Sequence, residues 1–411
     1  MTRLLMPLLI VALTISSATA EPFRKVLSSV KQNVQVGDWK LSPADAKLKG
    51  NWSVRQRELH GGKQDGVRII EIDNGALQMT VVPTRGMSIL RVVSGEVHLG
   101  WNSPVKEVVN PKFINLQSRG GLGWLDGFNE WMVRCGLESA GHPGKDSFTN
   151  NVGDEATLEL TLHGKIGNIP ASEVQVIVDD KPPHRIRIRG RVDERSFYGA
   201  QLEIWTEVST VPGSKVFRID DVITNRGAAE QEFQVIYHAN HGAPLMEKGA
   251  RLLAPVKRVT PFNQYAAKSV ATWDVYPAPT PGFVERVYCL YPLADDDGRT
   301  LVMLQNAAAD KAVSFAYPVK QLPYLTQWKN ALPLGGGYVT GIEPGTGFPA
   351  NRSVERKAGR VPKLKPGQSR RFTLDVGLHA GGDAVKAVAA KIKKIQGDQK
   401  VQIDTKTTIV K

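Results

Sequence analysis

The chain has 411 residues, of which 41% are hydrophobic and 23% charged, so it is long and apolar enough to bury a sizeable core. This composition excludes a disordered or fibrous protein, and the 39 glycines and 25 prolines predict the frequent turns of an all-β fold. The formal net charge is +13, but the basic residues are dispersed outside the C-terminal segment 383–411, and no zinc-finger or helix-turn-helix pattern accompanies them. We therefore expect a solvated basic surface and no nucleic-acid partner.

The segment Met1–Ala20 has the layout of a secretory signal peptide. A positive charge at Arg3 precedes the apolar run Leu4–Ile15, and small residues close the segment at Ala18-Thr19-Ala20. The apolar run is too short to cross a bilayer comfortably, which disfavours the alternative of an uncleaved anchor. We expect cleavage after Ala20, export to the periplasm or beyond, and no transmembrane segment in the mature chain.

Export permits disulfides, and the chain has two cysteines, Cys135 and Cys289. Their spacing does not decide between one bridge and two separate buried thiols. The cysteines form no CxxC pair and no multi-cysteine metal pattern, so a structural zinc site is not expected.

The remaining chain divides into three parts. Residues 21–50 are expected to form an irregular lead-in, residues 51–381 a single β-sandwich domain, and residues 382–411 a C-terminal helix with a polar, basic tail. The tail after Gly397 is expected to be loose, and whether it docks on the sandwich stays open. The helix is predicted over Ala384–Gln396, because its apolar residues fall on one stripe. A second, short helix is predicted near Leu122–Cys135.

The central part alternates between apolar and polar residues with a period of two, as strands with one buried face do. In Thr157–His163, for example, the leucines share one face and the polar residues share the other. Asp73-Asn74-Gly75 and Asn225-Arg226-Gly227 separate such segments and are typical of hairpin turns. Because strands and helices do not alternate, a doubly wound parallel fold is excluded, and we predict an all-β, antiparallel sandwich with few short helices. The other predicted strands are Val67–Asp73, Ala76–Val82, Glu173–Val178, Arg185–Val192, Ala200–Val208, Val216–Ile223, Gln231–Tyr237, Thr300–Asn306, Gly337–Glu343 and Arg371–Leu378.

Three segments at the ends of predicted strands carry residues capable of chemistry. His238 and His241 are three positions apart, which places them on opposite faces of a strand and disfavours a shared metal ion. No nucleotide-binding or metalloprotease motif is present, so neither a metal nor another cofactor is expected. The three segments are Leu162-His163-Gly164, Tyr237-His238-Ala239-Asn240-His241-Gly242 and Gly341-Ile342-Glu343-Pro344-Gly345.

A carboxylate and an imidazole that face each other across a sugar ring can interconvert its anomers by moving two protons. One group removes the proton of the anomeric hydroxyl, and the other protonates the ring oxygen, which opens the hemiacetal. Rotation about the C1–C2 bond and reclosure then give the other anomer. Glu343 with one or two histidines suffices for this chemistry, since it requires neither a metal nor a nucleophile.

Six short motifs follow one another along the chain. They are Val82-Pro83-Thr84-Arg85-Gly86-Met87, Leu99-Gly100-Trp101-Asn102-Ser103-Pro104, His163-Gly164-Lys165-Ile166, Tyr237-His238-Ala239-Asn240-His241-Gly242, Gln327-Trp328-Lys329 and Ile342-Glu343-Pro344-Gly345-Thr346. In this order they resemble the motifs of the aldose 1-epimerase (galactose mutarotase-like) superfamily and are most similar to its DUF4432 branch. The resemblance covers roughly residues 65–380 and implies a large antiparallel β-supersandwich that acts on a small-molecule sugar.

By this resemblance, His238 is the general acid that protonates the ring oxygen, Glu343 is the general base, and His163 helps to hold the sugar. The chain departs from typical mutarotases in the segments around both His238 and Glu343. The usual Asn-His-x-Tyr-Phe-Asn is replaced by the segment around His238, and the usual Glu-x-Gln by Glu343-Pro344-Gly345. The sugar-binding aspartate of those enzymes has no clear counterpart, so the identity of the sugar stays open.

Further candidates for contacts with the sugar lie in polar, loop-like segments. Trp101 and Trp328 can stack on the apolar face of a sugar ring, with core or edge packing as the alternative for both. Asn240 can orient the sugar or the catalytic histidine, with a turn-capping role as the alternative. The resemblance also calls for an arginine, for which the candidates are Arg85, Arg119 and Arg134.

The sequence therefore predicts an exported aldose 1-epimerase-like isomerase. One alternative is a non-catalytic carbohydrate-binding protein on the same fold, which would retain the tryptophan platforms without needing a proton-transfer pair. Another is a polysaccharide lyase or a different sugar epimerase, and a lyase would require groups that neutralise the charge of a uronate. The fold alone does not decide among these functions.

Overall fold

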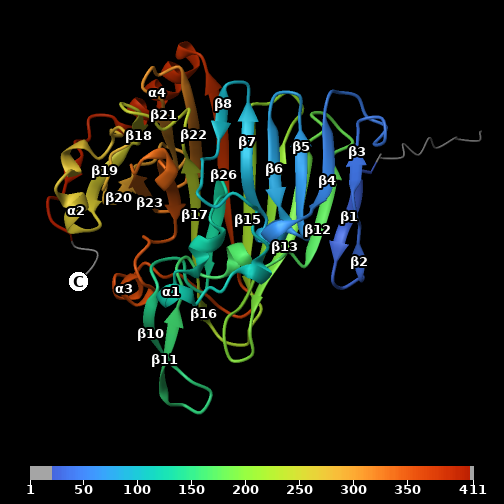
Figure 1. Cartoon of the computed structure of the whole chain (residues 1–411), viewed down its shortest axis with the longest axis horizontal. Coiled ribbons are helices and arrows are strands. Elements are labelled where there is room, and N and C mark those ends of the chain that lie inside the picture. The colour runs from blue at the N-terminus through green and yellow to red at the C-terminus, as the bar shows by residue number, and fades with distance from the viewer. Residues whose placement is uncertain (1–20, 408–411) are drawn as a thin grey trace, which may run out of the picture.

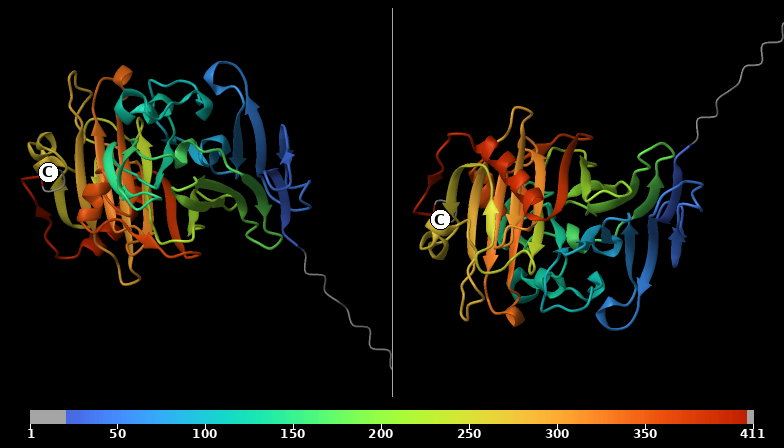
Figure 2. Two further views of the ribbon diagram at one scale, coloured as in Figure 1. Left: turned by 90° about the horizontal axis from the view of Figure 1, so that it is seen from below. Right: turned by 90° about the horizontal axis from the view of Figure 1, so that it is seen from above.

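Two large β-sheets stacked face to face make up the body of the molecule, as Figure 1 and the two end-on views of Figure 2 show. The computed structural model describes residues 21–407, so the expected signal peptide and residues 408–411 lie outside the described part. The architecture confirms the predicted all-β supersandwich. The helices of the described residues are α1 (Ser118–Gly121), α2 (Gln264–Ala267), α3 (Arg352–Lys357) and α4 (Gly382–Gln396).

The first sheet has ten strands, and every neighbouring pair in it is antiparallel. In spatial order its strands are β18 (Arg251–Leu253), β21 (Arg299–Gln305), β22 (Lys311–Pro318), β26 (Ser369–Ala380), β15 (Val216–Asn225), β14 (Gln201–Thr210), β13 (Ile186–Arg195), β12 (Glu173–Val178), β1 (Phe23–Ser29) and β2 (Val34–Gln35).

The second sheet has thirteen strands and is antiparallel except where its short edge strand β27 runs parallel to β19. In spatial order its strands are β27 (Gln402–Ile403), β19 (Val256–Pro261), β20 (Arg286–Pro292), β23 (Tyr324–Asn330), β24 (Val339–Gly345), β17 (Gln234–His241), β9 (Met132–Leu137), β7 (Ser88–Ser94), β6 (Gln78–Val82), β5 (Val67–Asp73), β4 (Ser53–Leu59) and β3 (Trp39–Leu41), and β8 (Val97–Leu99) pairs with β7. Two small pairs, β10 (Gly144–Thr149) with β11 (Glu155–Leu160) and β16 (Gln231–Glu232) with β25 (Lys363–Leu364), lie outside the large sheets.

The main hydrophobic core fills the space between the two sheets. In β13, Ile186, Ile188 and Val192 are buried in this core, while Arg187 and Arg189 alternate with them on the other face. This is the period-two pattern that predicted the strands. Each predicted strand overlaps a strand of the structure.

A buried ion pair bridges the two sheets within this core. Arg134 of β9 donates hydrogen bonds to Asp221 of β15 through Nε, at 2.5 Å, and through Nη2, at 3.0 Å. Its Nη2 also donates to the Thr206 hydroxyl of β14, and the Tyr237 hydroxyl of β17 donates to Asp221 at 2.8 Å. Arg134 and Asp221 are fully buried, so the ions are stabilised by each other and by these hydrogen bonds instead of by water.

The structure corrects the expectation of an irregular lead-in over residues 21–50. β1 pairs with β12 in the first sheet, and β3 pairs with β4 in the second. Leu27 and Leu41 from these strands are buried in the main core. β2 and β3 are too short to show a period of two, and Lys25 interrupts the apolar alternation of β1.

The short helix predicted near Leu122–Cys135 is confirmed only in part. A five-residue 3-10 helix spans Gly123–Gly127, and the chain then enters strand β9. A Cβ atom at Gly123 would lie 1.7 Å from the carbonyl oxygen of Asn115, so this turn depends on close backbone packing. All six residues of β9 are buried, which hides the alternation that marks a strand.

The two predicted turns have different outcomes. Asp73-Asn74-Gly75 connects β5 to β6 as a hairpin, as expected. Asn225-Arg226-Gly227 is a turn but joins no hairpin, because β15 pairs with β14 and β26. The Asn225 side chain accepts a hydrogen bond from the Gly227 N–H and donates one to the Ala229 carbonyl, which directs the chain toward the other sheet.

The C-terminal helix is confirmed as α4, which packs Val385, Val388 and Ile392 on the first sheet. The tail beyond it, which was expected to be loose, docks on the second sheet through β27. Asp404 accepts hydrogen bonds of 2.6 Å from Arg258 and from Thr260. None of the helices within residues 21–407 combines the length and the apolar character needed to cross a bilayer.

Cys135 and Cys289 are both free and buried, so of the two arrangements that the sequence left open, the structure has separate thiols. Burial raises the pKa of each thiol well above its ordinary value. Both side chains therefore remain in the protonated, weakly nucleophilic form.

Asp221→Asn is expected to lower the free energy of unfolding by about 3–5 kcal/mol, because it leaves the Arg134 cation buried without a counter-charge. Asp220→Asn is the matched control, since the neighbouring Asp220 pairs with the exposed Arg371 and its loss should cost less than about 1 kcal/mol. Urea unfolding of both variants measures the difference. Equal effects at the two positions would contradict the structural role given to the bridging pair.

Candidate functional site

A cavity of about 200 Å³ lies on the face of the thirteen-stranded sheet that points away from the main core. The alternation along β17 sets this direction: Val235, Tyr237 and Ala239 enter the core, whereas Ile236 and His238 point to the other face. The cavity, called the first cavity below, is lined by Leu122, Trp124, Leu125, Phe128, His142, Leu162, His163, His238, Glu285, Val287, Thr326, Trp328, Glu343 and Pro349.

His238 and Glu343 meet in this cavity from neighbouring strands. Strands β17 and β24 pair so that Ala239 is opposite Ile342, and His238 Nε2 lies 3.3 Å from Glu343 Oε1. Gly341 leaves the space that this contact needs, because a Cβ atom there would lie 2.3 Å from Glu343 Oε1 and 3.2 Å from His238 Cε1. The structure thus brings the predicted acid and base into direct contact with each other and does not place them on opposite sides of a sugar ring, as the sequence analysis expected.

Burial shifts the proton affinities of this pair in opposite directions. Desolvation, followed by the charge of Glu285, raises the pKa of Glu343 well above its ordinary value of 4.5. Desolvation, followed by the neighbouring His163, lowers the pKa of His238 well below its ordinary value of 6.5. Both groups therefore favour their uncharged forms, with a proton on the carboxyl group and a neutral imidazole beside it.

His163 lies next to His238, with ring centroids 5.1 Å apart. Its Nδ1 lies 3.0 Å from the Ala140 carbonyl oxygen, to which it donates, so Nε2 is left as the acceptor in the neutral ring. Burial lowers the pKa of His163 to about 4, which keeps the ring neutral at pH 7. The following Gly164 permits this placement, because a Cβ atom there would lie 2.1 Å from the Ser139 carbonyl oxygen.

Aromatic side chains form one wall of the cavity, called the aromatic wall below and made up of Trp124, Phe128 and Trp328. The Phe128 ring lies 4.5 Å from Trp124 and 6.2 Å from Trp328, measured between centroids. Trp328 donates from Nε1 to the Glu285 carboxylate at 2.8 Å, which fixes the indole at the cavity edge. Flat apolar surfaces of this kind suit the C–H faces of a sugar ring.

Within the described residues, four buried polar atoms at the cavity have no hydrogen-bond partner in the protein. They are His238 Nδ1, Thr326 Oγ1, Trp124 Nε1 and Glu343 Oε1. A buried polar group without a partner costs free energy, so such groups mark places where a polar ligand supplies the missing bond. Two of these atoms belong to the acid–base pair, and Thr326 adjoins it, because Thr326 is paired with Glu343 across β23 and β24.

Arg85, Trp101 and Asn240 do not line the cavity; all three converge on Glu130 behind the aromatic wall. Arg85 forms a fully buried ion pair with the Glu130 carboxylate at 2.8 Å. Trp101 and Asn240 both donate to the Glu130 carbonyl oxygen, at 3.2 and 3.1 Å. Arg85 also donates to the Gly127 carbonyl, so this group supports the loop that carries Phe128.

The other arginine candidates are also elsewhere. Arg119 is exposed and pairs with Asp126, and Arg134 belongs to the bridging pair in the core. Of the described residues that line the first cavity, none is lysine or arginine. The structure thus corrects the expectation that an arginine candidate reaches the sugar in this cavity.

Several lining residues were missed by the sequence analysis. Trp124 and Phe128 lie in the glycine-rich segment after α1, and His142 follows a glycine and precedes a proline. Glycine-rich segments with isolated aromatic residues were the only signal, and they do not show which way a side chain points. His142 stacks on Phe262 with centroids 5.3 Å apart, and burial lowers its pKa.

The expected separation of His238 and His241 is confirmed. His241 points into the core, where its ring lies 5.8 Å from Phe315 of the other sheet. Burial lowers the pKa of His241 to about 3. Within residues 21–407, no three side chains of His, Cys, Asp or Glu converge in an arrangement that could hold a metal ion.

Comparison with known proteins places the chain among sugar-isomerase-like folds. The family model DUF4432, described as a domain of unknown function, matches residues 64–378. A crystal structure from Klebsiella pneumoniae, of a protein provisionally described as an aldose 1-epimerase, is 46% identical, with a TM-score of 0.89 over 95% of this chain and 100% of the other. A galactose mutarotase-like protein of Clostridium acetobutylicum is 14% identical, with a TM-score of 0.52 over 80% and 98%, and shares the fold. No curated protein matches the chain.

Arg85→Leu is expected to destabilise the loop that carries the aromatic wall, because Glu130 is then buried without its partner. The loss should be about 3–5 kcal/mol in the free energy of unfolding, and hydrogen exchange should speed up most over residues 109–130. Arg57→Leu serves as the control, since Arg57 pairs with Glu71 in a half-exposed position. Exchange that speeds up equally throughout the chain would contradict the support role.

Proposed function

The chain belongs to the DUF4432 family, and we propose that it is an aldose 1-epimerase-like isomerase that interconverts the anomers of a small sugar. The observation that carries the proposal is the contact between Glu343 and His238 in a cavity with unpartnered polar atoms. The resemblance of the fold to sugar epimerases and mutarotases supports the same function.

The proposed reaction needs the pair to hold one proton. In one form Glu343 is an ionised base and His238 a charged acid, as the family resemblance implies. Transfer of that proton across the 3.3 Å contact gives a carboxylic acid and a neutral imidazole, which the burial of both groups favours. In this second form His238 takes the proton of the anomeric hydroxyl, and Glu343 protonates the ring oxygen.

Either form opens the ring, and closure on the other face of the carbonyl returns both protons. The net reaction leaves the pair as it began, so no external acid or base is consumed. The aromatic wall stacks on the sugar, and the Thr326 hydroxyl and His163 Nε2 lie where they can bind its hydroxyl groups. The cavity of about 200 Å³ is below the roughly 300–1,000 Å³ typical of drug-sized ligands, which suits a single monosaccharide.

The charges of the cavity favour a neutral sugar over a uronate. The carboxylate of Glu285 lines it, and no lysine or arginine among the described lining residues offers a positive charge. A uronate carboxylate would meet like charge without neutralisation, which costs free energy in a buried site. This charge pattern favours the isomerase over the polysaccharide lyase alternative.

Glu343→Gln and His238→Asn are each expected to lower kcat/KM for anomer exchange by about 10²–10⁴-fold, the usual contribution of one acid–base group. Saturation-transfer NMR on neutral aldoses and on their uronates measures the exchange, with spontaneous mutarotation subtracted. The neutral aldoses should exchange faster than the uronates in the wild-type protein. Sugar binding without catalysed exchange in any of the three proteins would instead show a carbohydrate-binding protein.

The dependence of anomer-exchange activity on pH tests which residue causes the loss of activity at low pH (the acid limb) and which causes it at high pH (the alkaline limb). Activity should fall at low pH as His238, whose pKa is lowered, takes up a second proton, and at high pH as Glu343, whose pKa is raised, loses the only one. Glu285→Gln should move the alkaline limb to lower pH, since the charge of Glu285 raises the pKa of Glu343. A shift of the acid limb alone in this variant would contradict the assignment.

A further inference from the structure

A second cavity, of about 500 Å³, lies beside the hairpin formed by β10 and β11. It shares none of its lining residues with the first cavity. Leu162 and His163 line the first cavity, whereas Leu158 and Lys165 of the same chain segment line the second. Its remaining walls come from α3, from β16 and from the turn that joins β13 to β14.

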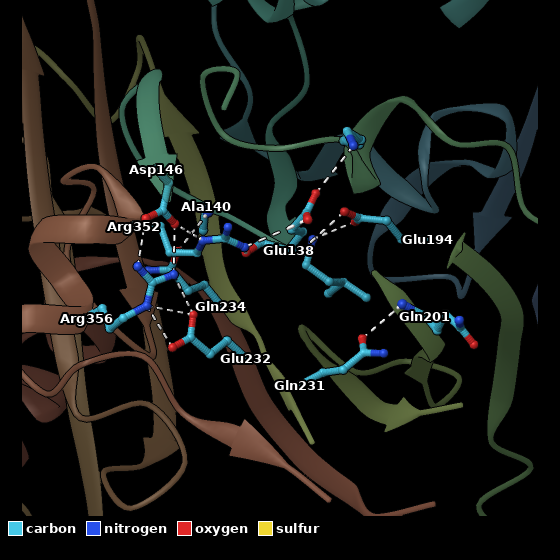
Figure 3. Close-up of polar contacts among 12 residues, drawn as sticks. Glu138, Ala140, Asp146, Glu194, Gln201, Gln231, Glu232, Gln234, Arg352 and Arg356 are labelled. Carbon is cyan, nitrogen blue, oxygen red and sulfur yellow. Dashed lines mark hydrogen bonds and ion pairs between the residues drawn. The ribbon is translucent and has the colours of Figure 1, made fainter. Parts of the chain in front are cut away.

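The floor of this cavity is a closed network of ion pairs, shown in Figure 3. Arg356 donates to both carboxylate oxygens of Asp146 and of Glu232, and Arg352 donates to Asp146 at 2.6 Å. Lys165 pairs with Glu138 at 3.4 Å. The network contains as many positive as negative side chains: Arg352, Arg356 and Lys165 against Asp146, Glu232 and Glu138.

This network leaves little for an anionic ligand to bind. The Nε, Nη1 and Nη2 groups of Arg356 are all engaged by carboxylates, and those hydrogen bonds raise its pKa further. Glu232 and Glu138 line the cavity, and their carboxylate oxygens have further lone pairs that can accept hydrogen bonds from hydroxyl groups. A neutral ligand rich in hydroxyl groups fits such a floor better than a phosphate or a carboxylate does.

Exposed aromatic rings border the cavity. Phe197 and Tyr198 are 84% and 67% exposed, although they lie in a tight turn, and their ring centroids are 4.1 Å apart. Tyr198 has a φ of +58°, a left-handed conformation that bulky residues rarely adopt. Phe148 of β10, which is 39% exposed, adds a third ring.

We propose that the second cavity is a binding subsite for a neutral oligosaccharide. The apolar faces of the sugar rings stack on Phe197, Tyr198 and Phe148, and their hydroxyl groups bind the charged floor. Its larger volume accommodates more than one sugar ring, in contrast to the first cavity. The subsite involves no chemical step, so it stands independently of the proposed isomerase activity.

The charged floor distinguishes this surface from a protein interface. The centres of protein–protein interfaces are depleted in charged residues such as lysine and glutamate. Here the aromatic rings instead border a polar hollow, with Lys165 and Glu232 in its lining. A sugar chain has the matching features: apolar ring faces that can stack on the aromatic rings, and hydroxyl groups that can bind the polar hollow.

The test is isothermal titration of the full-length mature protein with maltohexaose, cellohexaose and xylohexaose. At least one should bind, and the double variant Phe197→Ala/Tyr198→Ala should bind it about tenfold more weakly or worse, as expected for the loss of two stacked rings. Phe113→Ala is the matched control, since Phe113 is an exposed ring away from both cavities. Trp328→Ala removes an aromatic ring from the first cavity only, so it should leave the affinity for the oligosaccharide unchanged.

Two results would overturn the proposal. One is the absence of binding to all three oligosaccharides, or binding that is lost in Trp328→Ala and retained in the double variant. The other is a wild-type protein that self-associates in analytical ultracentrifugation while the double variant is monomeric, which would assign the aromatic rings to a contact between copies. Anomer exchange should be unchanged in the double variant, so failure of the isomerase proposal is distinguishable from failure of this one.

Discussion

The buried ion pair between Arg134 and Asp221 is the interaction on which the position of the site depends. Arg134 and Tyr237 occupy the core-facing side of β9 and β17, and His238 is the next residue along β17 on the opposite side. A shift of either strand by one residue would exchange these faces, removing His238 from the cavity and leaving Asp221 without its partners. The hydrogen bonds to Asp221 and Thr206 therefore fix the register of the two strands that support the cavity.

A second buried charge has the same effect on the loop in front of the sheet. The carboxylate of Glu130 binds Arg85, and its carbonyl oxygen accepts from Trp101 and Asn240. These side chains were expected to contact the sugar, and instead they hold the loop that places Phe128 against His238, with ring centroids 5.4 Å apart. Residues in motifs shared with a family can thus hold a binding site in place without lining it themselves.

The sequence predicts strands that alternate visibly, such as β13, and it also predicts parts of β17 and β24 from the segments Gln231–Tyr237 and Gly337–Glu343. It misses β9, because every residue of this strand is buried and no period of two is visible. His238 and Glu343 were found because their motifs resemble a family. Trp328 of the aromatic wall was found in this way, but Trp124 and Phe128 were not, because they lie in a loop whose path depends on contacts with Arg85, distant in sequence.

The burial of Glu343 and His238 is compatible with acid–base work because the proposed reaction creates no lasting charge. Moving a charged group into a low-dielectric site is costly, and the shifted pKa values of both residues express that cost. A pair that shares one proton is neutral overall in either of its forms, so it avoids most of this penalty. In anomer exchange one proton leaves the sugar as another enters it, and the pair stays neutral throughout. The environment that would suppress a lone carboxylate base therefore suits a reaction in which two groups exchange protons in concert.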